Sequence, residues 1–305
     1  MFDIIGDIHG CASLLKTLLK RLGYEKKGMT FIHPERKAVF VGDFVNRGQE
    51  IRQTLQIIRG MVESGHALAI LGNHEIEAVL FSIKRDKKES PLNKDGKRYD
   101  SVHETVLQFS NFRDEWKSYC KWLRSLPLFI EEEGVRIVHA CWKDENIQLI
   151  RDELPPGKIP KAVLRNLVLD SRSPLSQAIL QSTRGIHLIM PPNLRVYDNL
   201  RRNHHLFRIR WWESPVGMTF QQFSFESKFK LPAYTIPPEI LHENEPYPED
   251  APPVFFGHYC RGNGPHVIRG NLCCVDACVT GTKRLAAYRW DGETQLSPEK
   301  MVFSK

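Results

Sequence analysis

Five short segments of this chain place polar side chains with metal-binding chemistry directly after apolar runs. They read GDIHG (6–10), GDFVNRG (42–48), GNHE (72–75), VHA (138–140) and FGH (256–258). Each apolar run is typical of a buried strand. The segments offer carboxylate, amide and imidazole donors, a mixed set that suits borderline or hard divalent metals: Asp7, His9, Asp43, Asn73, His139 and His258.

The spacing of these residues allows them to share one or two ions. Side chains at i and i+2 of an extended chain project to the same side, so Asp7 and His9 can reach one ion. Asp43 repeats the arrangement after the next strand, and its two carboxylate oxygens can bridge two cations. Two metals roughly 3.5–4 Å apart, bridged by a carboxylate and a water, form a clamp for phosphoryl displacement. The sequence therefore indicates phosphoryl chemistry.

Each segment alone has a simpler interpretation. An isolated Asp after glycine at a strand end is usually a turn or helix-capping residue, and an isolated His in VHA is more often a core histidine. Five such segments in one order favour a common site, because open α/β sheets bind ligands at the carboxyl edge of their strands.

Alternating strand and helix patterns predict the elements that position this site. We expect strands at 2–6, 38–41, 67–71, 128–130, 136–139, 254–257, 271–277 and 285–290, and helices at 14–22, 51–62, 75–83 and within 106–126. This alternation predicts an α/β sandwich with right-handed crossovers.

Residues from about 143 to 250 are less regular and are expected to form an insertion or cap within a single domain, 1–305. Short helices at 161–169 and 175–181 and a strand near 207–211 are expected inside it. The predicted ligands lie on both sides of this region, so the core would close around it.

The order GDxHG, GDxxxRG, GNHE, HA and GH resembles the calcineurin-like metallophosphoesterases. Within that family it is similar to the phosphoprotein-phosphatase branch, which includes bacterial diadenosine tetraphosphate hydrolases and Ser/Thr protein phosphatases. The resemblance covers residues 1 to about 142 and 253 to about 290. It implies a four-layer αββα sandwich with two divalent metal ions, commonly manganese, with iron, zinc, nickel or cobalt as alternatives.

The resemblance also implies a role for each matched residue. Asp7 and His9 would hold the first metal, Asp43 would bridge, and Asn73, His139 and His258 would hold the second. His74 would donate a proton to the leaving oxygen. Arg47 would bind the substrate phosphate beside Asn73, which suits a guanidinium because it binds two phosphate oxygens at once and stays charged.

One position departs from the family pattern. The second segment is usually GDxVDRG, whose second Asp orients and charges the histidine of GNHE, but this chain has Asn46. An Asn oxygen can accept a hydrogen bond but carries no charge, so His74 would be harder to keep protonated. We expect a weaker general acid, or compensation by another carboxylate such as Glu75. A weaker acid matters less for good leaving groups, which favours phosphoanhydrides.

The RIRWW stretch, from Arg208 to Trp212, mixes cations and large aromatics. It could form a substrate wall, with an indole stacking on a base and an Arg binding a second phosphate. The favoured interpretation is an amphipathic strand whose tryptophans cover the core. Trp142 and Tyr259 could line the pocket or pack beneath it.

The composition of the 305-residue chain, 41% hydrophobic and 26% charged, is that of a globular protein. We find no membrane span and no signal peptide, so a cytoplasmic protein is expected. Its seven cysteines are expected to be reduced thiols. A zinc site at Cys273, Cys274 and Cys278 lacks a second matching pair.

The net charge of +7 favours anionic partners. The densest basic cluster, 84–88 with 94–98, is expected to be a solvated loop, with a rim that attracts phosphorylated substrates as the alternative. The interspersed charges do not predict a nucleic-acid surface.

The sequence thus predicts a metal-dependent hydrolase of nucleotides or dinucleoside polyphosphates. The alternatives are a Ser/Thr phosphoprotein phosphatase and a non-catalytic metal-binding scaffold. The partner is expected to be a small phosphorylated substrate or a phosphoprotein, and the oligomeric state is not predicted.

Overall fold

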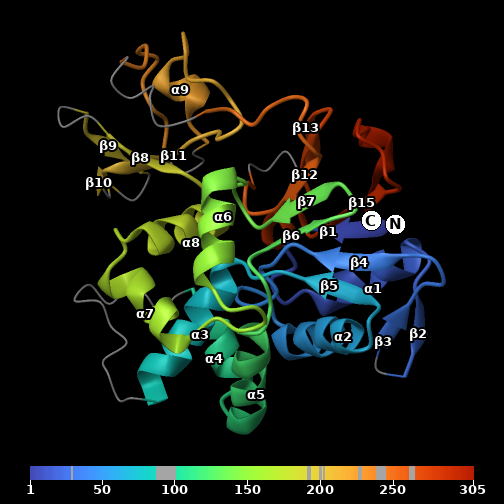
Figure 1. The fold of residues 1–305 in the computed structure, drawn as a ribbon. Helices are drawn as coiled ribbons and strands as arrows, with labels where there is room; N and C mark the ends of the chain where they lie inside the picture. The colour runs from blue at the N-terminus through green and yellow to red at the C-terminus, as the bar shows by residue number, and fades with distance from the viewer. Residues whose placement is uncertain are drawn as a thin grey trace.

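The computed structural model describes residues 1–28, 30–86, 101–190, 194–198, 201, 203–225, 229–237, 245–260 and 265–305. Two five-stranded sheets form its centre, and most helices lie below them and to their left in Figure 1. The side chains of the basic cluster at 84–88 and 94–98 fall outside the described part. None of the described helices combines the length and apolar character needed to cross a bilayer.

The first sheet has the strand order β16-β15-β1-β4-β5. Strands β1, β4 and β5 run parallel, β15 lies antiparallel beside β1, and β16 lies antiparallel beside β15. The bounds are β1 (Phe2–Ile5), β4 (Lys37–Phe40), β5 (Ala67–Ala69), β15 (Ala286–Trp290) and β16 (Met301–Phe303). The chain therefore brings its C-terminal strands beside its first strand.

The second sheet has the order β13-β14-β12-β7-β6 and also contains three parallel strands, with one antiparallel strand at each edge. Strands β7, β12 and β14 run parallel, and β6 and β13 flank them antiparallel. The bounds are β6 (Phe129–Glu132), β7 (Val135–Val138), β12 (Val254–Phe256), β13 (His266–Arg269) and β14 (Leu272–Cys274). Each sheet thus has three parallel strands, and the loops that follow their carboxyl ends carry the motifs that the sequence placed after strands.

Alternation along the strands builds the layers, because successive residues of a strand face opposite sides. Ile4 and Val39 of the first sheet share a buried cluster with Phe255 of the second. The next residue, Phe256, belongs to a different cluster on the outer side of the second sheet. This pattern identifies two sheets packed face to face and confirms the α/β sandwich.

The helices beside the first sheet follow the predicted apolar stripes. They are α1 (Ala12–Arg21), α2 (Ile51–Glu63), α3 (Asn73–Asp86), α4 (His103–Gln108) and α5 (Arg113–Leu123). Leu15, Leu18 and Leu19 of α1 are fully buried, as are Leu55 and Ile58 of α2. The 3.6-residue period therefore predicted the buried faces correctly.

The first part of the expected irregular region is regular. Helices α6 (Asp144–Glu153), α7 (Lys161–Leu169) and α8 (Pro174–Arg184) place Ile150, Leu164 and Ile179 in the same core cluster as α1 and α2. The sequence predicted α7 and α8 but not α6, which is mostly polar (DENIQLIRDE) and buries only Ile147 and Ile150.

The second part consists of short pieces around aromatic side chains. They are β8 (His187–Ile189), β9 (Val196–Tyr197), β10 (Asn203–His204), β11 (Leu206–Arg208) and α9 (Phe220–Phe223). Phe207, Phe220 and Phe223 pack in one cluster with Phe256, so this segment covers the outer face of the second sheet. The remaining elements are β2 (Glu25–Lys27), β3 (Thr30–Ile32), α10 (Val279–Thr282) and the 3-10 turn η2 (Pro298–Lys300).

Candidate active site

The loops after the parallel strands bring the predicted metal ligands to one cavity of about 450 Å³. Five of the six line this cavity directly: Asp7, His9, Asp43, Asn73 and His258. The sixth, His139, is fully buried, with its Nε2 3.4 Å from Oδ1 of Asp43. Residues separated by up to 251 positions in the chain therefore share one site.

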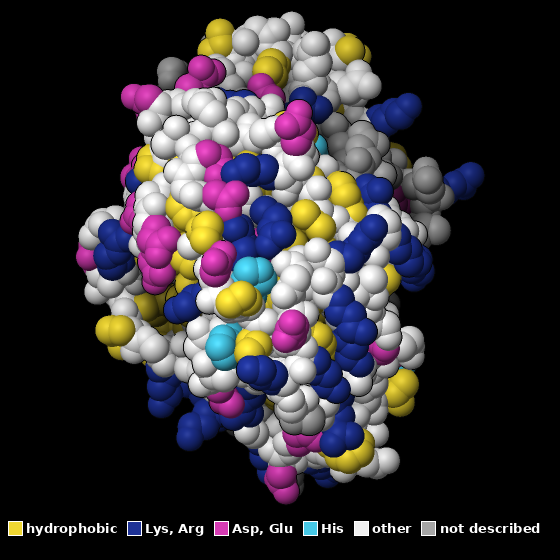
Figure 2. Space-filling model, turned by 90° about the vertical axis from the view of Figure 1, so that its right-hand side faces the viewer, with side chains coloured by type: hydrophobic (Ala, Val, Ile, Leu, Met, Phe, Trp, Pro, Cys, Tyr) yellow, Lys and Arg dark blue, Asp and Glu magenta, His cyan; other side chains and the backbone are white. Residues whose placement is uncertain are grey.

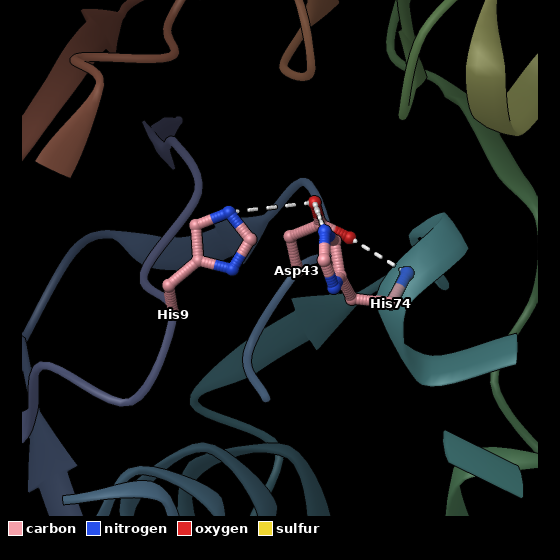
Figure 3. Close-up of side chains that lie close together, drawn as sticks. All are labelled: His9, Asp43 and His74. Carbon is pink, nitrogen blue, oxygen red and sulfur yellow. Dashed lines mark hydrogen bonds and ion pairs between the residues drawn. The ribbon is translucent and has the colours of Figure 1, made fainter. Parts of the chain in front are cut away.

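Asp43 lies at the centre of this group. Figure 3 shows the rings of His9 and His74 beside its carboxylate, with Nε2 of His74 3.9 Å from Oδ2. Nε2 of His9 lies 3.6 Å from Oδ2, and the backbone N–H of His74 donates to Oδ1 at 3.1 Å. With His139 at the same carboxylate, Asp43 stands between the two predicted ligand sets.

Backbone carbonyls determine which nitrogen of two imidazoles faces the cavity. Nδ1 of His139 donates to the carbonyl oxygen of Val41 at 2.7 Å, and Nδ1 of His9 donates to that of Val45 at 3.2 Å. Because Nδ1 carries the proton, Nε2 of each neutral ring has its lone pair free for a metal. This second contact is the usual way in which proteins orient histidine ligands.

Two glycines let the chain approach the predicted carboxylate ligands closely. A Cβ at Gly257 would lie 2.1 Å from Oδ1 of Asp7, and one at Gly72 would lie 2.2 Å from Oδ1 of Asp43. The carboxylates occupy the space that any other side chain would need. The glycines of the motifs are thus required by the site itself.

The backbone is strained where these side chains emerge. Five site residues, none of them glycine, have φ between 44° and 66°, in the left-handed region: His9, Asp43, Asn46, Arg47 and His258. Such conformations cost on the order of 1–3 kcal/mol each and concentrate at functional sites.

The electrostatics of the site fit bound cations. Burial, followed by the charge of Asp276, raises the pKa of Asp7. Burial lowers the pKa of His139, but the charge of Asp43 outweighs this effect and raises it to about 10. Without cations, Asp7 and His139 would therefore take up protons that partly neutralise the buried carboxylates. Divalent cations would replace those protons, so the donor set fits two such ions.

Comparison with known proteins identifies the family to which the chain belongs. Residues 1–201 match the family model described as calcineurin-like phosphoesterase. The chain belongs to the calcineurin-like phosphoesterase family. A symmetrical bis(5'-nucleosyl)-tetraphosphatase from Ralstonia nicotianae is 34% identical over 293 residues, which cover 93% of this chain and 87% of the relative.

Other relatives share only part of their length with this chain. An asymmetrical bis(5'-nucleosyl)-tetraphosphatase PrpE from Geobacillus sp. is 47% identical over 85 residues, which cover 28% of this chain. The chain spans 35% to 49% of the length of this and two further curated relatives. A serine/threonine phosphatase from Saccharomyces cerevisiae, similar to human PP5, has a TM-score of 0.50 at 14% identity. Its match covers 99% of this chain and 78% of that one, and it shows the fold alone.

The residue that departs from the family pattern contacts the predicted proton donor. Nδ2 of Asn46 lies 2.8 Å from Nδ1 of His74, and Nη2 of Arg47 lies 3.0 Å from Nε2 of the same ring. A neutral imidazole accepts at only one nitrogen. If the Asn46 amide were rotated by 180°, its oxygen could accept a hydrogen bond from Nδ1–H of His74. The amide nitrogen would then face Oγ1 of Thr105, which lies 2.6 Å from Oδ1 in the present orientation.

Glu75 does not compensate for the missing carboxylate. Its two oxygens accept four backbone N–H groups, those of Asp43, Phe44, Val45 and Gly72, at 2.7–3.1 Å. These bonds join the second and third motifs and hold the Asp43 loop in place. The expectation that Glu75 might charge His74 was wrong because the carboxylate is directed at the backbone.

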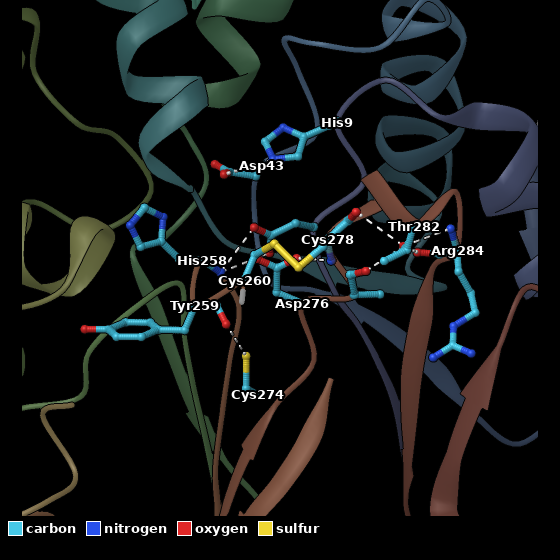
Figure 4. Close-up of a disulfide and its surroundings, with 12 residues drawn as sticks. His9, Asp43, His258, Tyr259, Cys260, Cys274, Asp276, Cys278, Thr282 and Arg284 are labelled. Atoms are coloured by element: carbon cyan, nitrogen blue, oxygen red, sulfur yellow. Dashed lines mark hydrogen bonds and ion pairs between the residues drawn. A yellow bond between two sulfur atoms is a disulfide. The ribbon is translucent and has the colours of Figure 1, made fainter. Parts of the chain in front are cut away.

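The expectation that all the cysteines are reduced was also wrong. Figure 4 shows a disulfide between Cys260 and Cys278. Each lies two residues beyond a cavity-lining residue, His258 or Asp276, so the bond joins the loops after β12 and β14. Thiols this far apart in the chain are paired by the sheet, which local spacing does not show.

The RIRWW stretch divides between core and cavity. Trp211 and Trp212 are 2% and 5% exposed and pack against Phe256, so the favoured interpretation of these tryptophans as core residues is confirmed. Trp142 and Tyr259 are likewise buried and do not line the cavity, and the Tyr259 ring contacts that of His258. Only Arg208 of the stretch lines the cavity.

Several cavity residues were missed from the sequence. Asp276 follows β14 just as Asp7 follows β1, so the strand-end rule could have found it. Glu77, Arg184 and His187 also line the cavity, and no motif marks them. Arg47 lines it as predicted, with an exposed side chain.

Proposed function

We propose that this protein is a dinuclear-metal phosphohydrolase that cleaves phosphoanhydrides of nucleotides or dinucleoside polyphosphates. The observation that carries the proposal is Asp43 with the five other predicted donors near it, beside the cavity that Arg47 lines and next to His74, whose backbone N–H donates to Asp43. Family membership supports the reaction class. The proposed substrate class rests on the residues of the site and on the names of the relatives.

The donor set divides into two groups around a shared carboxylate. Asp7 and His9 would hold one ion and Asn73, His139 and His258 the other, with Asp43 between them. Manganese is the proposed metal, with iron, zinc, nickel or cobalt as alternatives that the mixed donors would also accept. When bound, the ions would supply charge neutralisation at phosphate and a water of lowered pKa.

Arg47 is placed to bind the reacting phosphate. Its guanidinium lines the cavity and lies 3.0 Å from Nε2 of His74. A phosphate at this position would accept hydrogen bonds from two N–H groups of the Arg47 guanidinium at once. The phosphate would then sit beside the imidazole, with the leaving oxygen within reach of that ring.

His74 would protonate the leaving oxygen through Nε2. Burial lowers the pKa of His74, although the charge of Asp43 opposes this effect. Asn46 orients the ring without adding negative charge, so protonation is less favoured than in relatives with Asp. A phosphate leaving group, already a weak base, needs little protonation, which supports anhydride rather than alkyl-ester substrates.

The names of relatives agree with an anhydride substrate. The Ralstonia relative, aligned over most of both chains, is named for bis(5'-nucleosyl)-tetraphosphate cleavage. Phosphoprotein phosphatase activity is the second candidate in the same reaction class. A metal-binding scaffold is the third.

A hydrolysis screen with Mn²⁺ separates these candidates. Its substrates are diadenosine tetraphosphate, nucleoside triphosphates, p-nitrophenyl phosphate, bis-p-nitrophenyl phosphate and a phosphopeptide. We expect the highest kcat/KM for diadenosine tetraphosphate, with the Asp43→Asn variant as the inactive control. A higher kcat/KM for the phosphopeptide would contradict the proposed anhydride substrate and favour phosphoprotein phosphatase activity. No turnover by a metal-loaded protein would favour the scaffold.

A further inference from the structure

A second cavity, of about 390 Å³, lies between α3, α5 and the start of α7. None of the described residues that line it also lines the active-site cavity. Among the described residues, no carboxylate lines it, and five side chains contribute positive charge: Lys117, Lys121, Arg124, Lys158 and Lys161. The active-site cavity, by contrast, also has four carboxylates, and the face in Figure 2 carries both basic and acidic side chains. The composition of the second cavity therefore favours an anionic ligand.

Arg124 is buried at this cavity without a charged partner in the described part of the chain. It is 9% exposed, and its Nε donates to the carbonyl oxygen of Ile159 at 2.9 Å. A guanidinium has five N–H donors, so four remain, and no described residue accepts from them. Arginine is rarely buried unless it is paired. Because Arg124 lines the cavity, an anion bound there would supply the missing acceptor.

Backbone hydrogen bonds hold two further lysines beside Arg124. The N–H of Ile159 donates to the carbonyl oxygen of Arg124 at 2.7 Å, opposite to the bond from Nε, so the segment before α7 is joined to the end of α5. Lys158 precedes Ile159, and Lys161 begins α7. The first turn of α7 contains no acidic residue, and its N-cap makes no side-chain hydrogen bond. The N–H groups and the dipole of this helix end add positive potential to the cavity.

The cations on α5 form a row along one face of the helix. Lys117, Lys121 and Arg124 are spaced at i, i+4 and i+7, which places them on the same side. Like charges at this spacing destabilise a helix. Lys117 has an ion pair with Asp114 at 3.1 Å, but the two side chains are 63% and 97% exposed, so water screens the pair. An anion in the cavity would reduce the repulsion within the row.

An aromatic pocket of about 270 Å³ adjoins the basic cavity, because Ser82 and Lys117 line both. Phe109 and Trp116 line this pocket, with their ring centres 5.0 Å apart. Phe109 is buried, whereas Trp116 is partly exposed. Nucleic-acid bases stack on aromatic side chains that are accessible in this way. From Trp116 to Arg124 the chain rises roughly 12 Å at 1.5 Å per residue, a distance that suits a base, a sugar and a short phosphate chain.

The geometry points to a second nucleotide-binding site between α3 and α5. The phosphates would bind Arg124 and the lysines around it, and the base would stack on Trp116. The ligand class is a nucleoside di- or triphosphate, because the basic cavity suits a phosphate chain and the adjoining aromatic pocket suits a base. The bound nucleotide would lie against α3, the helix whose first residues belong to the active site. The inference requires neither the predicted metal ions nor the proposed hydrolysis.

Calorimetric titration of the full-length, Mn²⁺-loaded protein tests the assignment. The ligand is an ATP analogue with methylene groups in place of both phosphate-bridging oxygens, which resists hydrolysis. The Lys121→Gln/Lys158→Gln double variant should weaken one binding event by more than about tenfold, the usual effect of losing charged hydrogen bonds. The matched control, Lys26→Gln/Lys27→Gln, neutralises two exposed lysines of β2 and should leave the titration unchanged. A Lys121→Gln/Lys158→Gln protein that titrates like the wild type would overturn the inference.

The Trp116→Leu variant separates the contribution of the base from that of the phosphates. Loss of stacking should weaken binding of the ATP analogue at the second site about tenfold. Binding of methylenediphosphonate, which has no base, should change less than about twofold. Equal effects on the two ligands would contradict a nucleotide as the ligand class. Absence of turnover in the hydrolysis screen would refute the proposed function and leave these binding results unaffected.

Discussion

The two sides of the cavity are built in different ways. The predicted metal ligands sit on short loops just after parallel strands, and Glu75 alone fixes four backbone N–H groups there. The facing charges of Arg184 and Arg208 come from a helix end and a short strand, and the Arg184–Glu77 pair is partly exposed. The difference suggests that reaction chemistry depends on the most constrained backbone, whereas the facing wall of the cavity consists of side chains that can exchange partners.

Removing the central carboxylate should have the largest effect. Asp43→Asn takes away the charge between the two ligand groups, so we expect loss of both metals and a fall in kcat of more than about 10⁴. Metal content by inductively coupled plasma mass spectrometry checks this. Full occupancy in the variant would contradict the central role of Asp43 and the contrast between the two sides.

Removing the proton donor should leave the constrained side otherwise intact. We expect His74→Ala to lower kcat by about 10²–10⁴, the usual contribution of a general acid, while both metals stay bound. The loss should be larger for an alkyl phosphate than for an anhydride, whose leaving group needs less protonation. Loss of metal from this variant would show that His74 supports the ligands rather than the leaving group.

Restoring the family carboxylate should have a smaller, substrate-dependent effect. Asn46→Asp adds a negative charge next to Nδ1 of His74, which raises the pKa of the ring and strengthens the acid. We expect about a tenfold gain in kcat on an alkyl phosphate and little gain on an aryl phosphate. An unchanged rate on the alkyl ester would rule out this account of Asn46.

Breaking the disulfide should change stability more than activity. The bond between Cys260 and Cys278 closes a loop of sequence separation 18, so reduction should lower the free energy of unfolding by roughly 3 kcal/mol. We expect kcat to change less than about twofold, because strand pairing and backbone hydrogen bonds also hold these loops. Denaturant titration with and without reductant measures the shift. The Cys260→Ser/Cys278→Ser double variant should show no response to reductant.

The difference between the two sides of the cavity also explains which features could be predicted from the sequence. Asp7, Asp43 and His139 each follow an apolar strand, so strand periodicity and glycine spacing placed them together without knowledge of the sheets. Arg184 meets the site only because α8 docks on the His139 loop, where the N–H of Ala140 donates to the carbonyl of Ser182, a contact that no local pattern encodes. The direction of the Glu75 carboxylate and the pairing of Cys260 with Cys278 depend on tertiary packing in the same way.

The aromatic segment shows a further limit of local patterns. Arg208 and Trp212 lie in one short stretch, yet one lines the cavity and the other is buried in the core. In an extended chain residues 208 and 212 would point to the same side, but β11 ends at Arg208 and the chain turns at 211–212. Only the position of the segment on the second sheet decides which face meets the cavity.

The placement of the first strand has a consequence for synthesis of the chain. Strand β1 pairs with β15 on one side, and the carboxylate of Asp7 accepts the N–H of His258, 251 residues later. At about 5–20 residues per second, roughly 13–50 s would separate the emergence of these two residues from the ribosome. One edge of β1 thus stays unpaired until β15 has been synthesised, and the metal site would be among the last parts of the molecule to form.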